Sequence, residues 1–191
     1  AGDDHTVPFA APCLAGNNLG GTRTFKTAGA ARGVEITIVP ASHDSSVNRV
    51  LLSEVHRRNL DRDNLTLRLG RPRGYIIRFT NGLVVYLTGD TAVHADMKTV
   101  IPDFHKPNAM VLNLGLSAIT TESGAYIAND LIRPATVIIS HPNEAASVGG
   151  KPRPGSRTAA ISGLLRSPVV LALSGRTMEL DGQGRCVAGC G

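Results

Sequence analysis

The chain has 191 residues, 42% of them hydrophobic and 18% charged, a composition that fits a soluble globular protein of one domain or slightly less. It excludes a membrane helix, which needs a run of roughly 18 apolar residues, and it is too hydrophobic for a disordered chain. Aromatic residues make up only 4%, so we expect a core of aliphatic strands with helices packed on them. The formal net charge of +5 favours anionic partners only weakly, and no membrane partner is expected.

The two ends of the chain differ from its middle. Residues 1–30 are rich in proline, glycine and asparagine and predict a loop-rich entry, whereas residues 182–191 form a polar tail with two cysteines. Residues 31–181 carry the alternating strand and helix patterns of the core. Because the first residues are neither a start methionine nor a signal peptide, we expect a single partial domain whose beginning has been removed.

Strand and helix patterns alternate along the core. Runs of β-branched and aliphatic residues predict strands at 34–40, 74–79, 83–87, 109–114 and 135–140, and a strand pair at 169–173 and 176–180. An Asn81-Gly82 turn makes the second and third of these a hairpin. Apolar spacing predicts helices at 47–58, 96–101, 122–131 and 157–165. The alternation indicates an α/β fold with helices covering sheets.

Three predicted strands are followed by a residue type that binds metals, namely His43, Asp90 and His141. In α/β folds, sites form from the loops at the carboxyl ends of strands, because those ends converge on one crevice. Imidazole nitrogens and a carboxylate oxygen are suitable ligands for a divalent ion that keeps one position open for water. Each residue taken singly is more often a turn former or a helix cap than a ligand.

The order of the motifs is more specific than any one of them. Gly89-Asp90-Thr91 after a hydrophobic strand, Ala41-Ser42-His43-Asp44-Ser45 upstream and Ser140-His141 downstream resemble the later metal motifs of the metallo-β-lactamase superfamily. With Asn18-Leu19-Gly20-Gly21-Thr22 and the run from Gly82 to Thr91, the chain is similar over residues 17–181 to the ascorbate-6-phosphate lactonase-like metal-dependent hydrolases. The resemblance implies an αββα sandwich whose N-terminal part is missing.

The resemblance also implies roles for the three residues. Asp90 would bridge two metal ions and be the catalytic residue, while His43 would complete the first metal site and His141 the second. The family's His-x-His-x-Asp-His signature is absent here, so we expect it in a preceding segment or a second chain. Asp4 and His5 imitate its end, but only 37 residues separate His5 from His43, and we interpret them as part of an ordinary loop.

These features predict a metal-dependent hydrolase. Water activated near Asp90 would attack a carbonyl carbon or a phosphorus in a small ester, lactone, amide or phosphoester. Zinc is the expected ion, with manganese and iron as alternatives, and the residues that bind substrate are unknown. The alternative functions are a non-catalytic binding or scaffold module of the same fold and a nuclease of the same superfamily.

Other polar residues receive structural interpretations. We expect His56, His94 and His105 at the surface, with contact to substrate as the alternative for His94 and His105. Thr120-Thr121-Glu122 is expected to be a helix cap. The basic stretch 151–157 lacks interleaved aromatic residues, so no nucleic-acid partner is expected.

The three cysteines suggest an oxidising compartment. Cys186 and Cys190 lie close together in the polar tail and are candidates for a disulfide, and Cys13 is a candidate to pair with a cysteine in the missing segment. We therefore expect a periplasmic or secreted protein, with the cytoplasm as the alternative.

Overall fold

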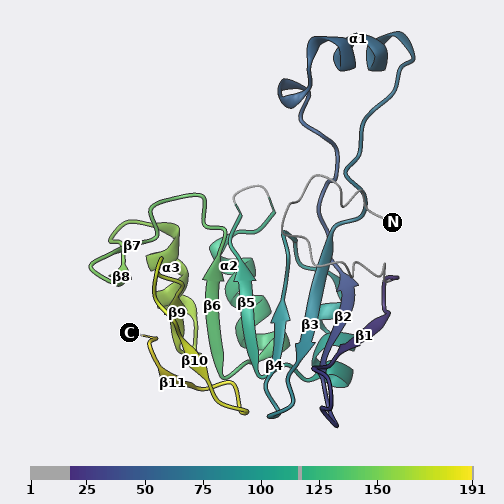
Figure 1. Ribbon diagram of the computed structural model, residues 1–191. Coiled ribbons are helices and arrows are strands. Elements are labelled where there is room, and N and C mark those ends of the chain that lie inside the picture. The colour runs from purple at the N-terminus through teal and green to yellow at the C-terminus, as the bar shows by residue number, and fades with distance from the viewer. Residues whose placement is uncertain (1–17, 116–117, 191) are drawn as a thin grey trace.

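The computed structural model describes residues 18–115 and 118–190, and its centre is one mixed seven-stranded sheet (Figure 1). The strand order is the order of the chain, from edge to edge: β1 (Thr22–Phe25), β2 (Val34–Pro40), β3 (Arg73–Arg78), β4 (Val84–Leu87), β5 (Ala109–Asn113), β6 (Thr136–Ser140) and β9 (Val169–Leu171). Five strands therefore form where the β-branched runs predict them, and the Asn81-Gly82 turn joins β3 to β4, with Gly82 at φ +96°.

The directions of the strands decide where their ends meet. Strands β2 and β4 are both antiparallel to β3, so they run the same way, and β5, β6 and β9 continue parallel to β4. The carboxyl ends of β2, β4, β5 and β6 consequently share one edge of the sheet, the upper edge in Figure 1. This is the convergence that the sequence predicts for the loops carrying its candidate ligands.

Helices cover one face of the sheet and form the main core with it. They are α2 (Thr121–Tyr126), which continues as a π-helix to Ile132, α3 (Arg157–Leu164), a 3₁₀ turn (Ala95–Met97) and a second π-helix (Val100–His105). Thr120 caps α2 by accepting a hydrogen bond from Ser123 N, which confirms the predicted cap. The core side chains are mainly aliphatic, as expected, although the aromatic Tyr86 is also fully buried. Other large, fully buried side chains include Met97, Ile101, Met110, Leu112, Ile127 and Ile161.

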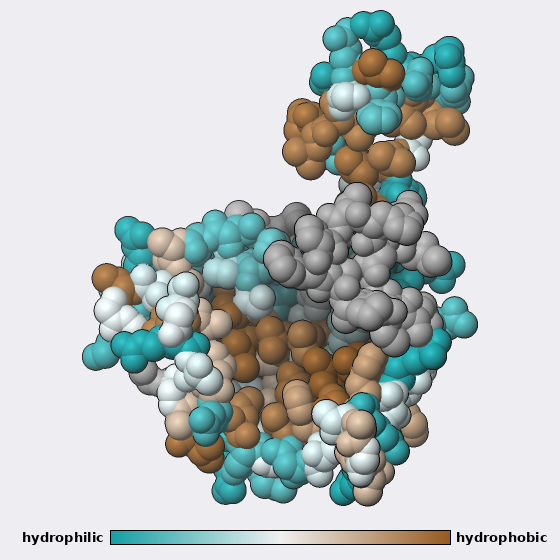
Figure 2. All heavy atoms as spheres, viewed as in Figure 1, coloured by the Kyte–Doolittle hydropathy of each residue, from teal (hydrophilic) through white to brown (hydrophobic). Residues whose placement is uncertain are grey.

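The opposite face of the sheet is apolar but only partly covered. Leu83, Val85 and Ala109 form a small buried cluster there, and Leu87 and Val111 beside them are only partly buried. Figure 2 shows this face as a hollowed brown area framed by hydrophilic residues. The described residues thus form one sheet layer and one helix layer, which is half of the four-layer αββα arrangement.

Residues 46–70 leave the carboxyl edge between β2 and β3 and project as an arm (Figure 1). Its neck is held by a bridge between Ser46 and Arg68 and by a hydrogen bond from Val47 N to Leu67 O of 2.9 Å. The predicted helix at 47–58 is instead a 3₁₀ turn (Arg49–Leu51) followed by α1 (Glu54–Arg62), because Ser53 caps α1 and accepts from His56 N. None of the residues of α1 is buried, so its apolar spacing does not mark a face packed on the core.

Both ends of the chain contain a strand that the sequence patterns do not predict. Within the entry 1–30, which is expected to be loop-rich, Thr22–Phe25 forms β1, an exposed edge strand that pairs with β2. The strands at 169–173 and 176–180 do not pair with each other: β9 completes the large sheet, while β10 (Glu179–Leu180) pairs with β11 (Cys186–Ala188). An edge strand and a short hairpin both take their order from a partner strand, which local patterning does not reveal.

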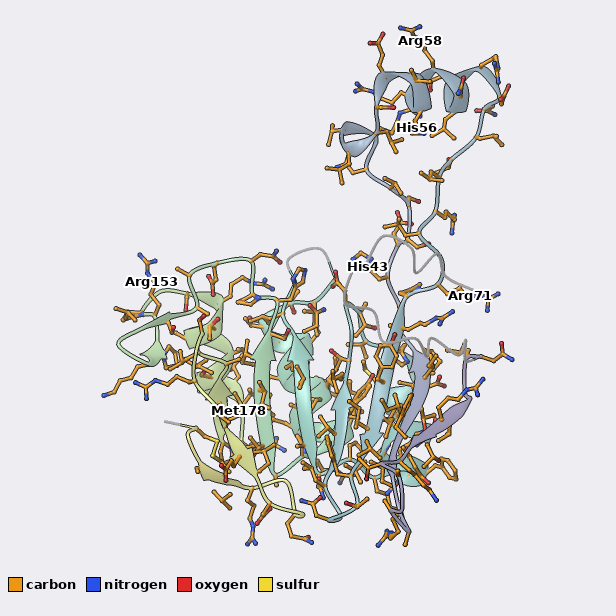
Figure 3. The ribbon with its side chains drawn as sticks, viewed as in Figure 1. His43, His56, Arg58, Arg71, Arg153 and Met178 are labelled. Carbon is orange, nitrogen blue, oxygen red and sulfur yellow. A yellow bond between two sulfur atoms is a disulfide. The ribbon has the colours of Figure 1, made fainter. Side chains whose placement is uncertain are left out.

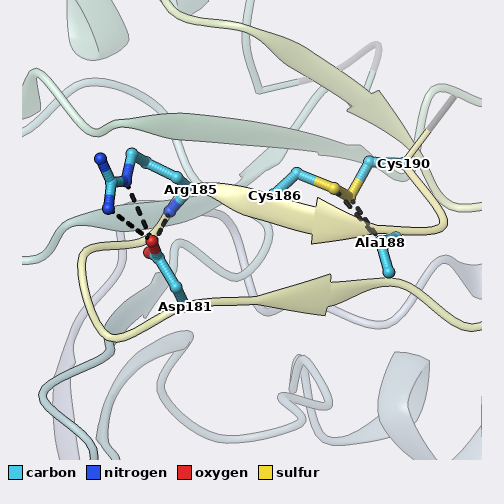
Figure 4. The surroundings of a disulfide bond; sticks show 5 residues. All are labelled: Asp181, Arg185, Cys186, Ala188 and Cys190. Atoms are coloured by element: carbon cyan, nitrogen blue, oxygen red, sulfur yellow. Dashed lines mark hydrogen bonds and ion pairs between the residues drawn. A yellow bond between two sulfur atoms is a disulfide. The ribbon is translucent and has the colours of Figure 1, made fainter.

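The tail at 182–191 therefore includes a strand, and its two cysteines are joined. Cys186 and Cys190 form a disulfide with their Cα atoms 6.2 Å apart, and both sulfur atoms lie 3.4 Å from Ala188 O (Figure 4). Asp181 accepts from Arg185 at the turn between β10 and β11. The structure thus pairs the two tail cysteines with each other, which the sequence alone leaves open, while Cys13 lies outside the described residues.

A small separate hairpin before α3 completes the fold. It is formed by strands β7 (Ser147–Val148) and β8 (Lys151–Pro152). In the described part of the chain, no helix is both long enough and apolar enough to cross a membrane.

Candidate metal centre

The three predicted ligands lie together at the carboxyl edge of the sheet. His43 follows β2 at the base of the arm (Figure 3). Asp90 follows β4, and His141 follows β6. Both histidines approach the same carboxylate oxygen: Asp90 Oδ2 lies 3.4 Å from His43 Nε2 and 3.7 Å from His141 Nε2. The side chains are 27%, 40% and 52% exposed for His43, Asp90 and His141, so this cluster is reachable from solvent.

A hydrogen bond orients the imidazole of His43. Its Nδ1 lies at hydrogen-bonding distance from the backbone carbonyl of Asp44. A carbonyl oxygen only accepts, so Nδ1 must carry the proton of that bond. In the neutral imidazole, Nε2 then presents its lone pair, and this is the atom that faces Asp90.

The loop that carries Asp90 is fixed by its neighbours in sequence. Gly89 has φ +67°, and a Cβ at this position would lie 2.2 Å from Arg73 O, so only glycine fits. Thr91 is fully buried, and its Oγ1 accepts from Ser42 N at 2.8 Å, which ties the Asp90 loop to the loop of His43. The backbone of Ser42 also accepts from Ala92 N at 2.8 Å.

His141 occupies an unusual backbone conformation. Its φ is +52°, in the left-handed region that non-glycine residues rarely adopt. The preceding residue, Ser140, accepts a hydrogen bond from Leu114 N at 2.9 Å, which joins the end of β6 to the loop after β5. The turn directs the imidazole back over the edge of the sheet toward Asp90.

A fourth residue of this cluster, Asn113, escaped the sequence reasoning. It ends β5, is 4% exposed, and its amide nitrogen donates to Asp90 Oδ1 at 3.0 Å. Gly115 lies against the same group, since a Cβ there would be 2.9 Å from His141 Cδ2 and 3.0 Å from Asp90 Oδ1. The only signal in the sequence was position: Asn113 is the one strongly polar residue in the buried run 109–114, at the carboxyl end of its strand.

A cleft of about 340 Å³ opens beside these residues. Asp90, Asn113 and His141 form its polar side, and Tyr75, Leu87 and Val111 form its apolar side. Its apolar residues belong to the partly covered face of the sheet. The cleft therefore connects the polar edge to the apolar face.

The donor types fit a divalent ion, but the described residues do not complete a site. Two imidazole nitrogens and one carboxylate suit zinc, manganese or iron. Across residues 18–115 and 118–190, however, no group of three or more His, Cys, Asp or Glu side chains is placed so that it could hold a metal ion. Further ligands would have to come from elsewhere, and the alternative ligands Asp4 and His5 lie outside the described residues.

The remaining histidines do not join the cluster. His56 is exposed on the arm, as predicted. His105 is only 8% exposed, so the predicted surface position is wrong; the π-helix turns it toward the body, and burial and then Arg78 lower the pKa of its imidazole. His94 is partly buried, its Nε2 has no hydrogen-bond partner among the described residues, and burial lowers its pKa against the opposing effect of Asp96.

The basic stretch 151–157 includes a structural residue. The guanidinium of Arg157 donates to the backbone carbonyls of Leu114 at 2.6 Å and Ile119 at 2.7 Å. These two bonds fasten the start of α3 to the segment that follows β5. Arg157 is therefore engaged with the chain's own backbone, whereas Arg153 lies at the periphery (Figure 3).

The chain is similar in sequence to metal-dependent hydrolases. No family model matches the chain. It is 33% identical over 129 residues to a UPF0173 metal-dependent hydrolase of Roseiflexus castenholzii, covering 67% of this chain and 44% of that protein. A UPF0173 metal-dependent hydrolase of Archaeoglobus fulgidus is 30% identical over 128 residues, covering 67% of this chain and 47% of the relative.

One solved structure has a fold similar to that of this chain. An isothiocyanate hydrolase from Delia radicum gut bacteria superposes with a TM-score of 0.50 and 16% identity, covering 84% of this chain and 59% of that one. At 16% identity this likeness shows a shared fold alone. In sequence the chain is similar to the UPF0173 metal-dependent hydrolases, and the matched part spans less than half of the two relatives described above.

Proposed function

We propose that this chain supplies the later metal ligands of a metal-dependent hydrolase. His43, Asp90 and His141 would hold divalent ions, with Asp90 shared between two of them. Zinc is the first expectation, and manganese and iron suit the same donors. The kinship with the UPF0173 metal-dependent hydrolases supports this class of activity.

One observation carries the proposal, namely the convergence of two imidazoles on a single carboxylate oxygen. Since Nδ1 of His43 donates to Asp44 O, the ring in its neutral form would turn an electron pair toward Asp90 Oδ2 at 3.4 Å. An electron pair facing an anionic oxygen is repulsive, and a cation near both atoms relieves the repulsion. A proton on Nε2 of the imidazole would also relieve this repulsion. Metal binding and protonation are therefore the two explanations for the contact, and a measurement of bound metal distinguishes them.

The bound ion would supply the reactive chemistry: a divalent metal lowers the pKa of a water molecule to about 7 and polarises a substrate oxygen. The chain's own residues bind and orient. Asp44 fixes the ring of His43, and Asn113 and Gly115 pack around the carboxylate of Asp90. Fixed ligands of this kind are what a metal hydrolase requires.

Completion of the site requires more protein than the described residues. We propose that a preceding segment or a second chain provides the remaining histidines and also covers the apolar face of the sheet. The partly exposed Leu87 and Val111 on that face support this, because apolar sheet faces of this size are normally buried. The relatives, of which less than half is matched, are long enough to contain such a part.

The proposed substrate is a small ester, lactone, amide or phosphoester. The cleft of about 340 Å³, with one polar side and one apolar side, has the size of a small-molecule site. The fold by itself does not choose among these substrates, since sites and not folds decide chemistry.

The experiment compares full-length protein with single variants. We expect stoichiometric divalent metal in the wild type by elemental analysis, and hydrolysis of at least one member of a panel of lactones, carboxylic esters and phosphodiesters. Asp90→Ala is expected to lose metal and to lower kcat/KM by at least about a thousandfold, since both ions depend on it.

His56→Ala is the matched control, because it removes a histidine from the exposed arm. It should leave metal content and turnover unchanged. A wild type that binds no metal would contradict the proposal and favour a binding module of the same fold. Turnover in Asp90→Ala equal to that of the wild type would contradict the role of this carboxylate.

The location of the protein is a separate proposal. We propose an oxidising compartment, periplasmic or extracellular, because Cys186 and Cys190 form a disulfide on an exposed terminal hairpin. Mass spectrometry after alkylation, without a reducing agent, should find both thiols protected in protein isolated from its native compartment. Full alkylation of both cysteines would favour the cytoplasm.

A further inference from the structure

Two asparagines lie at opposite ends of strand β5, and their side chains have different hydrogen-bond partners. Asn108 comes immediately before the strand, at the edge of the sheet remote from the metal centre, and Asn113 is its last residue. Both side-chain amides make several hydrogen bonds. Only Asn113 reaches a candidate ligand.

The amide of Asn113 can adopt only one orientation. Its Oδ1 accepts from the backbone N–H of Gly115 at 2.8 Å, and a backbone N–H can only donate. Its Nδ2 lies 3.4 Å from the backbone carbonyl of Thr91, which can only accept. Exchanging the oxygen and nitrogen would place like groups together at both contacts, so Nδ2 is the atom that faces Asp90.

This fixed donor gives the two carboxylate oxygens of Asp90 different partners. Oδ1 accepts from Asn113 Nδ2 at 3.0 Å, whereas Oδ2 is the oxygen that lies near the two imidazoles. The terminal torsion of an aspartate has a broad energy profile, so an unheld carboxylate turns easily. A neutral amide donor holds Oδ1 without adding a charge that would compete with a cation.

We propose that Asn113 is the positioning residue of the metal centre: it holds Asp90 Oδ1 so that Oδ2 faces both His43 and His141. The proposal rests on the proposed function, because the value of this orientation lies in metal binding. Asn113 is suited to the role by burial, being 4% exposed, and by its anchoring to backbone groups of two loops. A buried hydrogen-bonded amide of this kind cannot change partners without leaving groups unpaired.

Asn108, immediately before the same strand, provides the matched comparison. Its Oδ1 accepts from Val84 N at 2.9 Å, and its Nδ2 donates to the carbonyls of Gly82 and Gly182 at 3.2 and 3.0 Å. All of these partners are backbone groups. Replacing either asparagine therefore removes bonds to the backbone, but only replacement of Asn113 releases a side chain of the metal centre.

The experiment measures zinc affinity and stability in full-length Asn113→Leu and Asn108→Leu. Leucine has the branched shape of asparagine, with two methyl groups in place of the amide oxygen and nitrogen, but it is larger and cannot hydrogen-bond. Both variants should lose stability in urea unfolding, since each leaves backbone groups unpaired. Competition with a chromogenic chelator should show zinc affinity about 10- to 100-fold weaker in Asn113→Leu only, the range seen when a residue that supports a metal ligand is lost.

Zinc affinity equal in the two leucine variants would overturn the proposal. Asn113→Ala, tested against Asn108→Ala, repeats the comparison if leucine prevents folding. A cobalt(II)-loaded sample gives an independent readout, because its visible spectrum follows ligand geometry; we expect it to change in the variants at position 113 only. An unchanged spectrum would also overturn the proposal.

A crystal structure of metal-free Asn113→Leu or Asn113→Ala separates this proposal from the proposed function. We expect the carboxylate of Asp90 to rotate relative to the metal-free wild type. If the wild type binds no metal but Asp90 rotates in the variant, the proposed function fails and the orienting contact stands. If Asp90 keeps its orientation in the variant, the positioning role fails whatever the wild type binds.

Discussion

Two regions leave the same edge of the sheet and differ in how they are held. The loops that carry Asp90 and His141 are tied by short hydrogen bonds and by glycines that admit no Cβ. The arm at 46–70 carries the apolar residues Val50, Leu51 and Val55, which are 74%, 79% and 63% exposed, and none of its α1 helix is buried. One region is fixed by packing, the other only by its neck and its own local bonds.

The difference shows how local patterns should be interpreted. The arm has a capped helix and three arginine–carboxylate pairs, Arg49–Asp61, Arg58–Glu54 and Arg62–Asp63. Exposed ion pairs of this kind stabilise by at most about 1 kcal/mol each. The carboxyl edge has fewer charges but more enclosed contacts. We therefore expect substitutions to matter at the edge and to have little effect on the arm.

The largest effect is expected for Gly89→Ala. Alanine would have to adopt φ +67° with its Cβ 2.2 Å from Arg73 O, so the backbone must move, and we expect a loss of about 3 kcal/mol in the free energy of unfolding. Gly70→Ala at the neck of the arm is the control: its φ is +99°, but a Cβ meets nothing within 4 Å. Urea unfolding should show the larger loss at position 89, and equal losses would contradict the packing difference.

A smaller but more specific effect is expected for Gly115→Ala. The new Cβ would lie 2.9 Å from His141 Cδ2 and 3.0 Å from Asp90 Oδ1, so both side chains must shift. We expect about 1–2 kcal/mol of destabilisation and zinc affinity lowered by about tenfold, because misplaced ligands bind weakly.

Gly163→Ala is the control for Gly115→Ala. It lies in helix α3, where a Cβ meets nothing within 4 Å, and alanine should stabilise the helix by up to about 1 kcal/mol. Zinc binding in Gly115→Ala as tight as in Gly163→Ala would show that the edge tolerates movement.

A pH effect should separate the helix layer from the arm. The pKa of His105 is below its ordinary value of 6.5 because of burial and Arg78, so the folded state binds fewer protons than the unfolded state. The contribution of His105 to stability is therefore fully present above pH 6.5. It is lost as the pH falls from 6.5 through the pKa of His105 in the folded state. His105→Gln should reduce this loss in urea unfolding between pH 7 and pH 5, a window around the ordinary histidine pKa, and His56→Gln on the arm should not. If His105→Gln lost as much stability as the wild type between pH 7 and pH 5, the assignment of this pH dependence to His105 would be contradicted.

The smallest effect is expected for Val55→Ala on the arm. Val55 is 63% exposed in α1, and alanine favours helices, so the free energy of unfolding should change by no more than about 0.5 kcal/mol. Val137→Ala, at a fully buried position of β6, should lose about 2 kcal/mol. A large loss at position 55 would show that the arm is packed against something in solution.

Much of the sheet can be predicted from the sequence because its strands are buried and locally consistent. β2, β4, β5 and β6 are dense in β-branched and aliphatic residues, and β2, β4 and β6 are each followed within three positions by a candidate ligand. Parallel direction then brings His43, Asp90 and His141 to one edge. The prediction of their proximity depended only on this topology.

The rest depended on contacts between distant segments. Asn113 gave little signal because its role arises from a hydrogen bond to Asp90, 23 positions away. The spacing of Val50, Leu51 and Val55 predicted a helix face but not whether anything covers it. His105 is buried because a π-helix turns it inward, and that irregular winding has no clear sequence pattern.

The left-handed backbone at His141 bears on how this protein would respond to selection. At φ +52°, glycine or asparagine is conformationally easier than histidine, so the residue found there opposes the preference of its own turn. A library randomised at this position and sorted for thermal stability should enrich glycine and asparagine. The same library sorted for turnover should return histidine. A difference between the two selected populations would show that the imidazole serves turnover and not stability.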